Sequence, residues 1–142
     1  MQTIHATAVA IGNRCVLLRG PSGAGKSDLA LRLIDGGATL VADDQTELIR
    51  EQGDLVARCP SAIAGKLEVR GVGILTLPYV SPATVSMVVN LVAPEEVERL
   101  PETACVELLG EQVRLVSLAP FEASAPAKVR SALNSVDWDC AG

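Results

Sequence analysis

Gly20-Pro21-Ser22-Gly23-Ala24-Gly25-Lys26-Ser27 is the stretch that decides the fold, because it fits the phosphate-binding pattern G-x-x-x-x-G-K-S/T at every fixed position. Its glycines allow successive backbone N–H groups to point at one anion, Lys26 adds a positive charge for the β and γ phosphates, and Ser27 offers a hydroxyl to Mg²⁺. Residues 15–19 are typical of a strand that enters this loop, and residues 28–35 of a helix that leaves it. All eight residues are therefore candidates for binding the phosphates of a nucleotide.

Length and composition limit the class of protein. The 142 residues predict a single domain over residues 1–142. The hydrophobic share is 49% with only one Trp, one Tyr and one Phe, so we expect a core of aliphatic residues built largely on strands. The net charge of −5 comes without a basic stripe, which argues against nucleic acid as a partner.

The N-terminal residues and the spacing of the cysteines indicate in which cellular compartment the protein resides. The N-terminal residues show no charged segment followed by an apolar run, and no stretch approaches the length of a membrane span. We therefore expect a cytoplasmic protein without membrane contact. The four cysteines are scattered with no C-x-x-C pair, which predicts reduced thiols and argues against a zinc site: Cys15, Cys59, Cys105 and Cys140.

A hairpin precedes the loop. Residues 3–10 alternate small and β-branched residues, and a tight turn at residues 11–14 leads into the strand before the loop. A hairpin at this point favours a mixed sheet over a wholly parallel one, so the predicted fold class is α/β, a phosphate-loop kinase core with a mixed β-sheet.

The second half of the chain predicts three further elements. Residues 84–92 form the most continuously apolar run and indicate a central strand. A second hairpin is expected around Gly110, and a helix from Ser124, a plausible cap, to Asn134. The last few residues are expected to fray.

Two acids, Asp43 and Asp44, follow a buried strand at residues 39–42. Open α/β sheets bind ligands at the carboxyl ends of their strands, so these carboxylates should emerge beside the loop. One of them can orient Mg²⁺ and the other can accept a proton from an attacking hydroxyl. The alternative is an acidic turn before the next strand at residues 47–50.

Residues 66–75 form a strand-like run that Gly71 and Gly73 interrupt, and this predicts a bulge or a close approach of the backbone to another group. Glu68 lies on the polar face of this run. Its carboxylate is either a metal ligand or part of a solvated strand face. On position alone, His5 in the first strand is a partly buried or edge histidine without a chemical role.

Five segments together resemble the catalytic domain of HPr kinase/phosphorylase, a bacterial family that phosphorylates a serine of the phosphocarrier protein HPr and also removes that phosphate. The resemblance implies a fold similar to the core of phosphoenolpyruvate carboxykinase, ATP and Mg²⁺ as cofactors, a short form without the N-terminal domain of longer members, and a homo-oligomer, typically a hexamer. The segments are Ile4-His5-Ala6-Thr7, the loop, Leu40-Val41-Ala42-Asp43-Asp44, Glu68-Val69-Arg70-Gly71-Val72-Gly73-Ile74 and Val89-Asn90-Leu91.

The resemblance also implies a role for each charged residue near the loop. Lys26 resembles the lysine that contacts phosphate, Ser27 and Glu68 resemble the Mg²⁺ ligands, and Asp43 supports the metal or the base. Asp44 resembles the residue that takes the proton from the target serine and returns a proton in the reverse direction.

By the same resemblance His5 becomes an active-site histidine, and Arg99 the catalytic arginine that neutralises charge on the transferring phosphoryl group. Two departures stand out. Residues 118–124 replace a Pro/Arg/Gly-rich segment tied to dephosphorylation in longer members, and Pro101 stands where a glycine is usual.

The sequence thus predicts an ATP- and Mg²⁺-dependent protein-serine kinase acting on HPr or an HPr-like carrier, with phosphorolysis as the reverse activity. Two alternatives stay open. One is a small-molecule kinase that uses the same loop and acids, and the other is a non-catalytic, ATP-responsive binding module.

Overall fold

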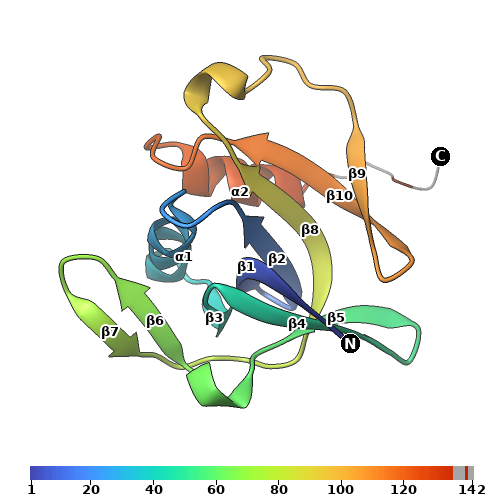
Figure 1. Ribbon diagram of the computed structural model, residues 1–142. Coiled ribbons are helices and arrows are strands. Elements are labelled where there is room, and N and C mark those ends of the chain that lie inside the picture. Colours follow the sequence, from blue (N-terminus) through green and yellow to red (C-terminus); the bar gives the residue numbers. More distant parts are fainter. Residues whose placement is uncertain (136–139, 141–142) are drawn as a thin grey trace.

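A computed structural model describes residues 1–135 and 140 of the chain (Figure 1). The predicted fraying concerns the final residues, and 136–139 and 141–142 lie outside the described residues. The elements in chain order are β1 (Gln2–Ile11), β2 (Arg14–Arg19), α1 (Lys26–Asp35), β3 (Thr39–Ala42), β4 (Gln45–Glu51), β5 (Asp54–Arg58), η1 (Ser61–Ile63), β6 (Lys66–Val69), β7 (Gly73–Thr76), β8 (Ala83–Leu91), η2 (Pro94–Glu96), β9 (Ala104–Leu108), β10 (Glu111–Leu118) and α2 (Ala125–Leu133).

Eight strands form one mixed sheet, which confirms the predicted fold class. Its order is β2-β1-β4-β5-β8-β10-β9, with β3 added on β1, and β2 also pairs with β8. Strands β2, β1, β4, β5 and β8 therefore form a closed ring of pairings. The β1–β2 and β9–β10 hairpins are antiparallel, whereas β8 runs parallel to both β2 and β10.

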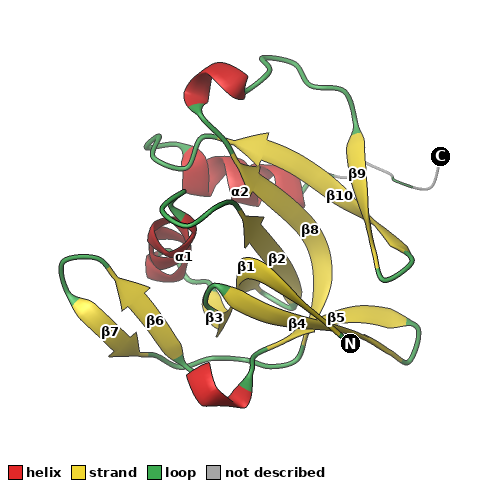
Figure 2. Ribbon diagram, in the orientation of Figure 1, coloured by secondary structure: helices red, strands yellow, loops and turns green. Residues whose placement is uncertain are grey.

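Both faces of the central strands are buried. Along β2, Val16 and Leu18 point into a cluster with Leu29 of α1 and Val129 of α2, while Leu17 points into a second cluster on the opposite face. Successive residues of a strand point to opposite faces, so an unbroken apolar run suits a strand that is covered on both sides. Figure 2 shows the two helices on one side of the sheet.

The glycines at residues 71 and 73 do not mark a bulge or a close approach, so this prediction was wrong. Gly71 lies in the turn of a separate two-stranded hairpin, β6–β7, and Gly73 is the first residue of β7 after that turn; both adopt positive φ, 88° and 122°. A Cβ at either position would meet nothing within 4 Å. The turn needs a backbone conformation that glycine adopts freely, which is the physical reason for both residues.

The prediction of four reduced thiols was also wrong. Cys105 at the start of β9 and Cys140 form a disulfide across a separation of 35 residues. No local pattern indicates this pair, because the fold alone brings the two cysteines together. Cys15 and Cys59 are free and buried, and burial raises the pKa of the Cys15 thiol to about 12.

Helix α2 confirms the predicted C-terminal helix. Ser124 occupies the N-cap position, but its side chain makes no capping hydrogen bond. No helix in the described part of the chain is long and apolar enough to cross a membrane.

Thiol titration tests the pairing of Cys105 with Cys140. In denaturant without reductant, Ellman's reagent should detect two thiols per chain, from Cys15 and Cys59, and four after reduction. Without denaturant, the thiols of the native protein should react more slowly than those of the unfolded protein. The reason is that Cys15 is buried and its pKa of about 12 keeps the thiol protonated at pH 8. Four thiols before reduction would contradict the disulfide, and the variant Cys105→Ser, with three before reduction, is the matched control.

Candidate active site

The 20–27 loop joins the end of β2 to the start of α1. Gly25 holds the N-cap position with φ 103°, and a Cβ on Gly20 would lie 2.8 Å from Cβ of Ala24, so the loop is tightly wound. Lys26 Nζ donates to the carbonyl oxygens of Gly20 (2.7 Å) and Pro21 (3.2 Å), and its side chain is only 6% exposed. The lysine charge is thus fixed inside the curve of the loop.

Asp43 ties three elements together. Its Oδ1 accepts hydrogen bonds from the hydroxyls of Ser27 (2.6 Å) and Thr7 (3.0 Å), and its Oδ2 accepts one from the backbone N–H of Glu68 (3.0 Å). Those donors belong to α1, β1 and β6. The carboxylate therefore fixes the Ser27 hydroxyl and the β6 strand relative to the sheet.

Asp44 is held in a different way. Its backbone has φ 65°, a left-handed conformation that is uncommon outside glycine and concentrates at functional sites. The N–H of Asp44 donates to the Thr7 hydroxyl (3.1 Å), and its carbonyl accepts from the N–H of Ala6 (3.1 Å). Its half-exposed carboxylate stays available, with Oδ1 3.5 Å from Lys26 Nζ and 3.7 Å from His5 Nδ1.

A cavity of about 590 Å³ lies between the loop, the two acids and the β6–β7 hairpin. The buried Leu67 anchors β6 in the helix-side core, so the alternation of the strand turns Glu68 the other way, toward this cavity. Eight of the predicted site residues line it: Ser22, Gly23, Gly25, Lys26, Ser27, Asp43, Asp44 and Glu68.

The oxygen donors around this cavity fit Mg²⁺. Ser27, Asp43 and Glu68 all line it, and Mg²⁺ is usually held by one or two carboxylates together with substrate phosphates. Among residues 1–135 and 140, no group of three or more His, Cys, Asp or Glu side chains is arranged to hold a metal. A hydroxyl, two carboxylates and phosphate oxygens would thus have to share the ion.

His5 and Arg99, two of the predicted site residues, do not line this cavity. His5 is 79% exposed and reaches the site only through Asp44. Arg99 follows η2, is exposed, does not line the cavity, and makes no hydrogen bond or ion pair with any described residue.

Sequence reasoning missed three residues that shape the site. Thr7 lies in the first strand beside His5, and its hydroxyl donates to Asp43 Oδ1 and accepts from the N–H of Asp44. Arg32 of α1 donates to the carbonyl oxygens of Pro120 and Glu122 and so fixes the chain after β10. Phe121 lines the cavity from this segment. An aromatic residue in a polar, proline-bounded turn was the only sequence signal.

The strand, loop and helix in this order, with a pair of acids at the end of β3, define the class of α/β folds with a phosphate-loop core and a mixed sheet. Within that class, residues 1–122 match the HPr Serine kinase C-terminal domain, and the chain belongs to this family.

Relatives and a solved structure agree with this assignment. The chain is 39% identical over 127 residues to the HPr kinase/phosphorylase of Burkholderia lata and to that of Burkholderia cenocepacia, a match over 82% of this chain and 39% of each relative. It therefore spans about two fifths of the length of these relatives. The structure of the Hpr(Ser) kinase/phosphatase from Coxiella burnetii is similar, with a TM-score of 0.81 and 30% identity over 92% of this chain and 87% of that chain.

Replacement of Thr7 tests the coupling of the two acids. In Thr7→Val the shape is kept but the hydroxyl is lost, so the Asp44 N–H and one Asp43 oxygen lose a partner in a buried place. We expect the free energy of unfolding, measured by urea denaturation, to fall by about 1–3 kcal/mol. Thr3→Val on the same strand is the matched control, because the exposed Thr3 hydroxyl donates only to the Met1 sulfur among residues 1–135 and 140. Equal stabilities of the two variants would rule out the coupling.

Proposed function

We propose that the chain is the kinase domain of an ATP- and Mg²⁺-dependent protein kinase that phosphorylates a serine of HPr or an HPr-like carrier. The observation that carries this proposal is the position of Asp44, whose half-exposed carboxylate lines the loop cavity with Oδ1 3.5 Å from Lys26 Nζ. Family membership supplies the acceptor, since the relatives are named HPr kinase/phosphorylase.

The proton transfer is assigned to Asp44. Its carboxylate accepts the proton of the serine hydroxyl, the serine oxygen forms a bond to the γ phosphorus, and the bond from that phosphorus to the bridging oxygen of ADP breaks. Lys26, buried and fixed by two carbonyls, holds positive charge against the phosphates throughout. In phosphorolysis, an oxygen of inorganic phosphate would attack the phosphorus of phosphoserine and the bond from that phosphorus to the serine oxygen would break. Asp44 would give a proton to the departing serine oxygen, and the product would be pyrophosphate.

Asp43 and Asp44 have different proposed roles because their carboxylates have different partners in the fold. Asp43 has both oxygens occupied by Thr7, Ser27 and Glu68, which suits a residue that orients the Ser27 hydroxyl for a metal. Mg²⁺ held by Ser27, Asp43 and Glu68 would neutralise charge on the β and γ phosphates.

His5 and Arg99 are also proposed to act in the site, but only His5 lies next to one of its residues. His5 Nδ1 lies 3.7 Å from the Asp44 carboxylate and would orient it. For Arg99 to neutralise the transferring phosphoryl group, the segment after η2 would have to approach the cavity. We further propose a cytoplasmic homo-oligomer, a hexamer by family resemblance, without nucleic-acid or membrane partners. Its net charge of −5 supports the absence of nucleic acid.

Transfer of label to HPr, measured with and without Asp44, tests the proposal. ATP labelled at the γ phosphate is incubated with the protein, Mg²⁺ and purified HPr, and the labelled residue is mapped by mass spectrometry. We expect a labelled serine. Asp44→Asn should lower the rate about 100-fold or more, since the base is lost, while the affinity for ADP stays within about threefold.

Asp35→Asn is the matched control, because Asp35 is an exposed acid at the far end of α1. Label on no protein but on a small molecule would favour a small-molecule kinase. Nucleotide binding without any transfer, under varied metals and pH, would favour the non-catalytic module. Full transfer by Asp44→Asn would show that Asp44 is not the base.

Glu68→Gln tests the metal assignment. The backbone N–H that binds Asp43 is retained and only the charge is removed. The Mg²⁺ concentration that gives half-maximal transfer should rise about tenfold or more, because one charged ligand is lost. Glu51→Gln, an exposed glutamate on β4, should leave this concentration unchanged. An unchanged Mg²⁺ requirement in Glu68→Gln would remove Glu68 from the ligand set.

A further inference from the structure

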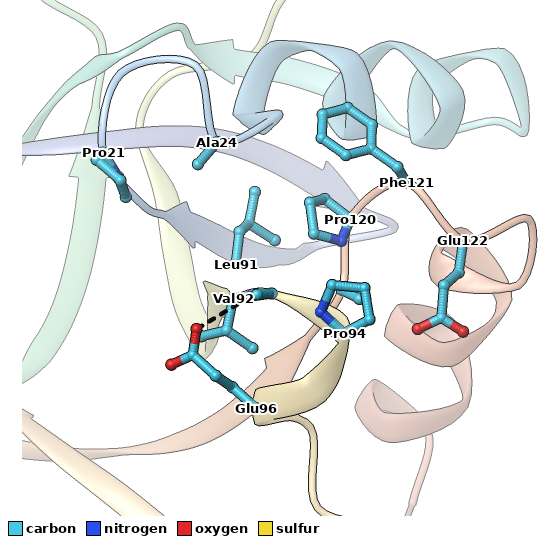
Figure 3. Close-up of a pocket in the computed structure, with 11 residues that line it drawn as sticks. Pro21, Ala24, Leu91, Val92, Pro94, Glu96, Pro120, Phe121 and Glu122 are labelled. Atoms are coloured by element: carbon cyan, nitrogen blue, oxygen red, sulfur yellow. Dashed lines mark hydrogen bonds between the residues drawn. The ribbon is translucent and has the colours of Figure 1, made fainter.

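A second cavity, of about 720 Å³, adjoins the 20–27 loop and is not used by the proposed chemistry (Figure 3). Its volume lies in the range of roughly 300–1,000 Å³ that is usual for small-molecule sites. The walls are mainly apolar. They are formed by Pro21 and Ala24 of the loop, Leu91 at the end of β8, Pro94 at the start of η2, and Pro120 and Phe121 after β10.

The position of this cavity follows from the strand directions. Strands β8 and β10 run parallel to β2, with Leu18 opposite Val89 and Leu118 opposite Leu91. The carboxyl ends of the three strands therefore meet at one edge of the sheet, where α/β folds bind their ligands. The loop leaves the first of these strands, and the cavity lies among the segments that leave the other two.

Phe121 stands where the two cavities meet, since it lines both. It is the only phenylalanine of the chain, yet its side chain is 69% exposed. The ring lies directly against the loop, because a Cβ on Gly25 would come within 2.8 Å of Phe121 Cζ. Figure 3 shows the ring beside Pro120, at the rim of the apolar cavity.

The segment that carries Phe121 is fixed on both sides. Arg32 donates to the carbonyl oxygens of Pro120 and Glu122, and the Glu122 carboxylate pairs with Lys128 of α2 at 3.4 Å. An exposed aromatic ring held in place in this way presents apolar surface at low entropic cost to whatever enters the cavity.

We propose that this cavity holds the base of the nucleotide whose phosphates occupy the loop, with Phe121 packed against the base; the inference rests on the proposed function. A nucleotide base is flat and aromatic, and it is attached to the phosphates that the adjoining loop binds. The lining offers few free polar groups, since Glu96 accepts from the Ala93 N–H (3.3 Å) and Glu122 pairs with Lys128. Apolar contact and stacking, more than hydrogen bonds, then hold the base.

Binding of ADP and of pyrophosphate separates the two cavities, because pyrophosphate has no base. Both ligands are titrated by calorimetry in Mg²⁺ into wild-type protein and Phe121→Ala. We expect the dissociation constant of ADP to rise about three- to tenfold in Phe121→Ala, the usual worth of an aromatic pair. The dissociation constant of pyrophosphate should stay within about twofold. Phe121→Trp should keep the wild-type affinity for ADP.

A second variant changes another residue that lines the cavity. Ala93, the extended N-cap residue of η2, also lines the cavity, so Ala93→Leu should fill part of it and weaken the binding of ADP but not of pyrophosphate. Leu100→Ala removes an exposed apolar side chain outside the cavity and should change neither affinity.

The outcomes distinguish this inference from the proposed function. If ADP and pyrophosphate bind the wild-type protein but Phe121→Ala weakens both equally, or neither, the cavity does not hold the base. If the wild-type protein binds neither ligand, the proposed function itself fails and the inference fails with it.

Discussion

The carboxylate of Asp43 is the constraint on which the rest of the site depends. It accepts hydrogen bonds from Thr7 of β1, Ser27 of α1 and the backbone of Glu68 in β6. Bonds to a charged group are worth roughly 1.5–3 kcal/mol each, whereas a domain is stable by only about 5–15 kcal/mol. One side chain therefore sets how the sheet, the loop and the β6–β7 hairpin lie relative to one another, and with them the cavity.

Strand direction explains why these groups meet at one edge. Strand β1 is antiparallel to both β2 and β3, so β3 runs the same way as β2 and ends beside the loop. Strands β8 and β10 are parallel to β2 and end at that edge as well. The acids at the end of β3 thus lie on one side of the loop, and the segment with Phe121 on the other. The phosphate chemistry and the apolar cavity are two consequences of one sheet.

Much of the fold could be predicted from local signals. The hairpin before the loop, the central strand at residues 84–92 and the α2 helix all appear, because periodicity and turn residues act over a few positions. The turn role of Gly71 and Gly73 was misjudged, since a glycine in a strand-like run shows only that an unusual backbone is needed. The Cys105–Cys140 disulfide and the contact of Arg32 with Pro120 were missed, because 35 and 88 residues separate the partners.

The sequence by itself determined the strand–loop–helix unit, the buried strand that ends in two acids, and a set of oxygen donors suited to Mg²⁺. These follow from residue type and short spacing. Only the tertiary structure decided which acid is tied down and which stays free, and that a lone phenylalanine borders the loop. The physical reason is that Thr7 and Asp43 lie 36 residues apart, and strand order and register alone bring such residues within hydrogen-bond distance.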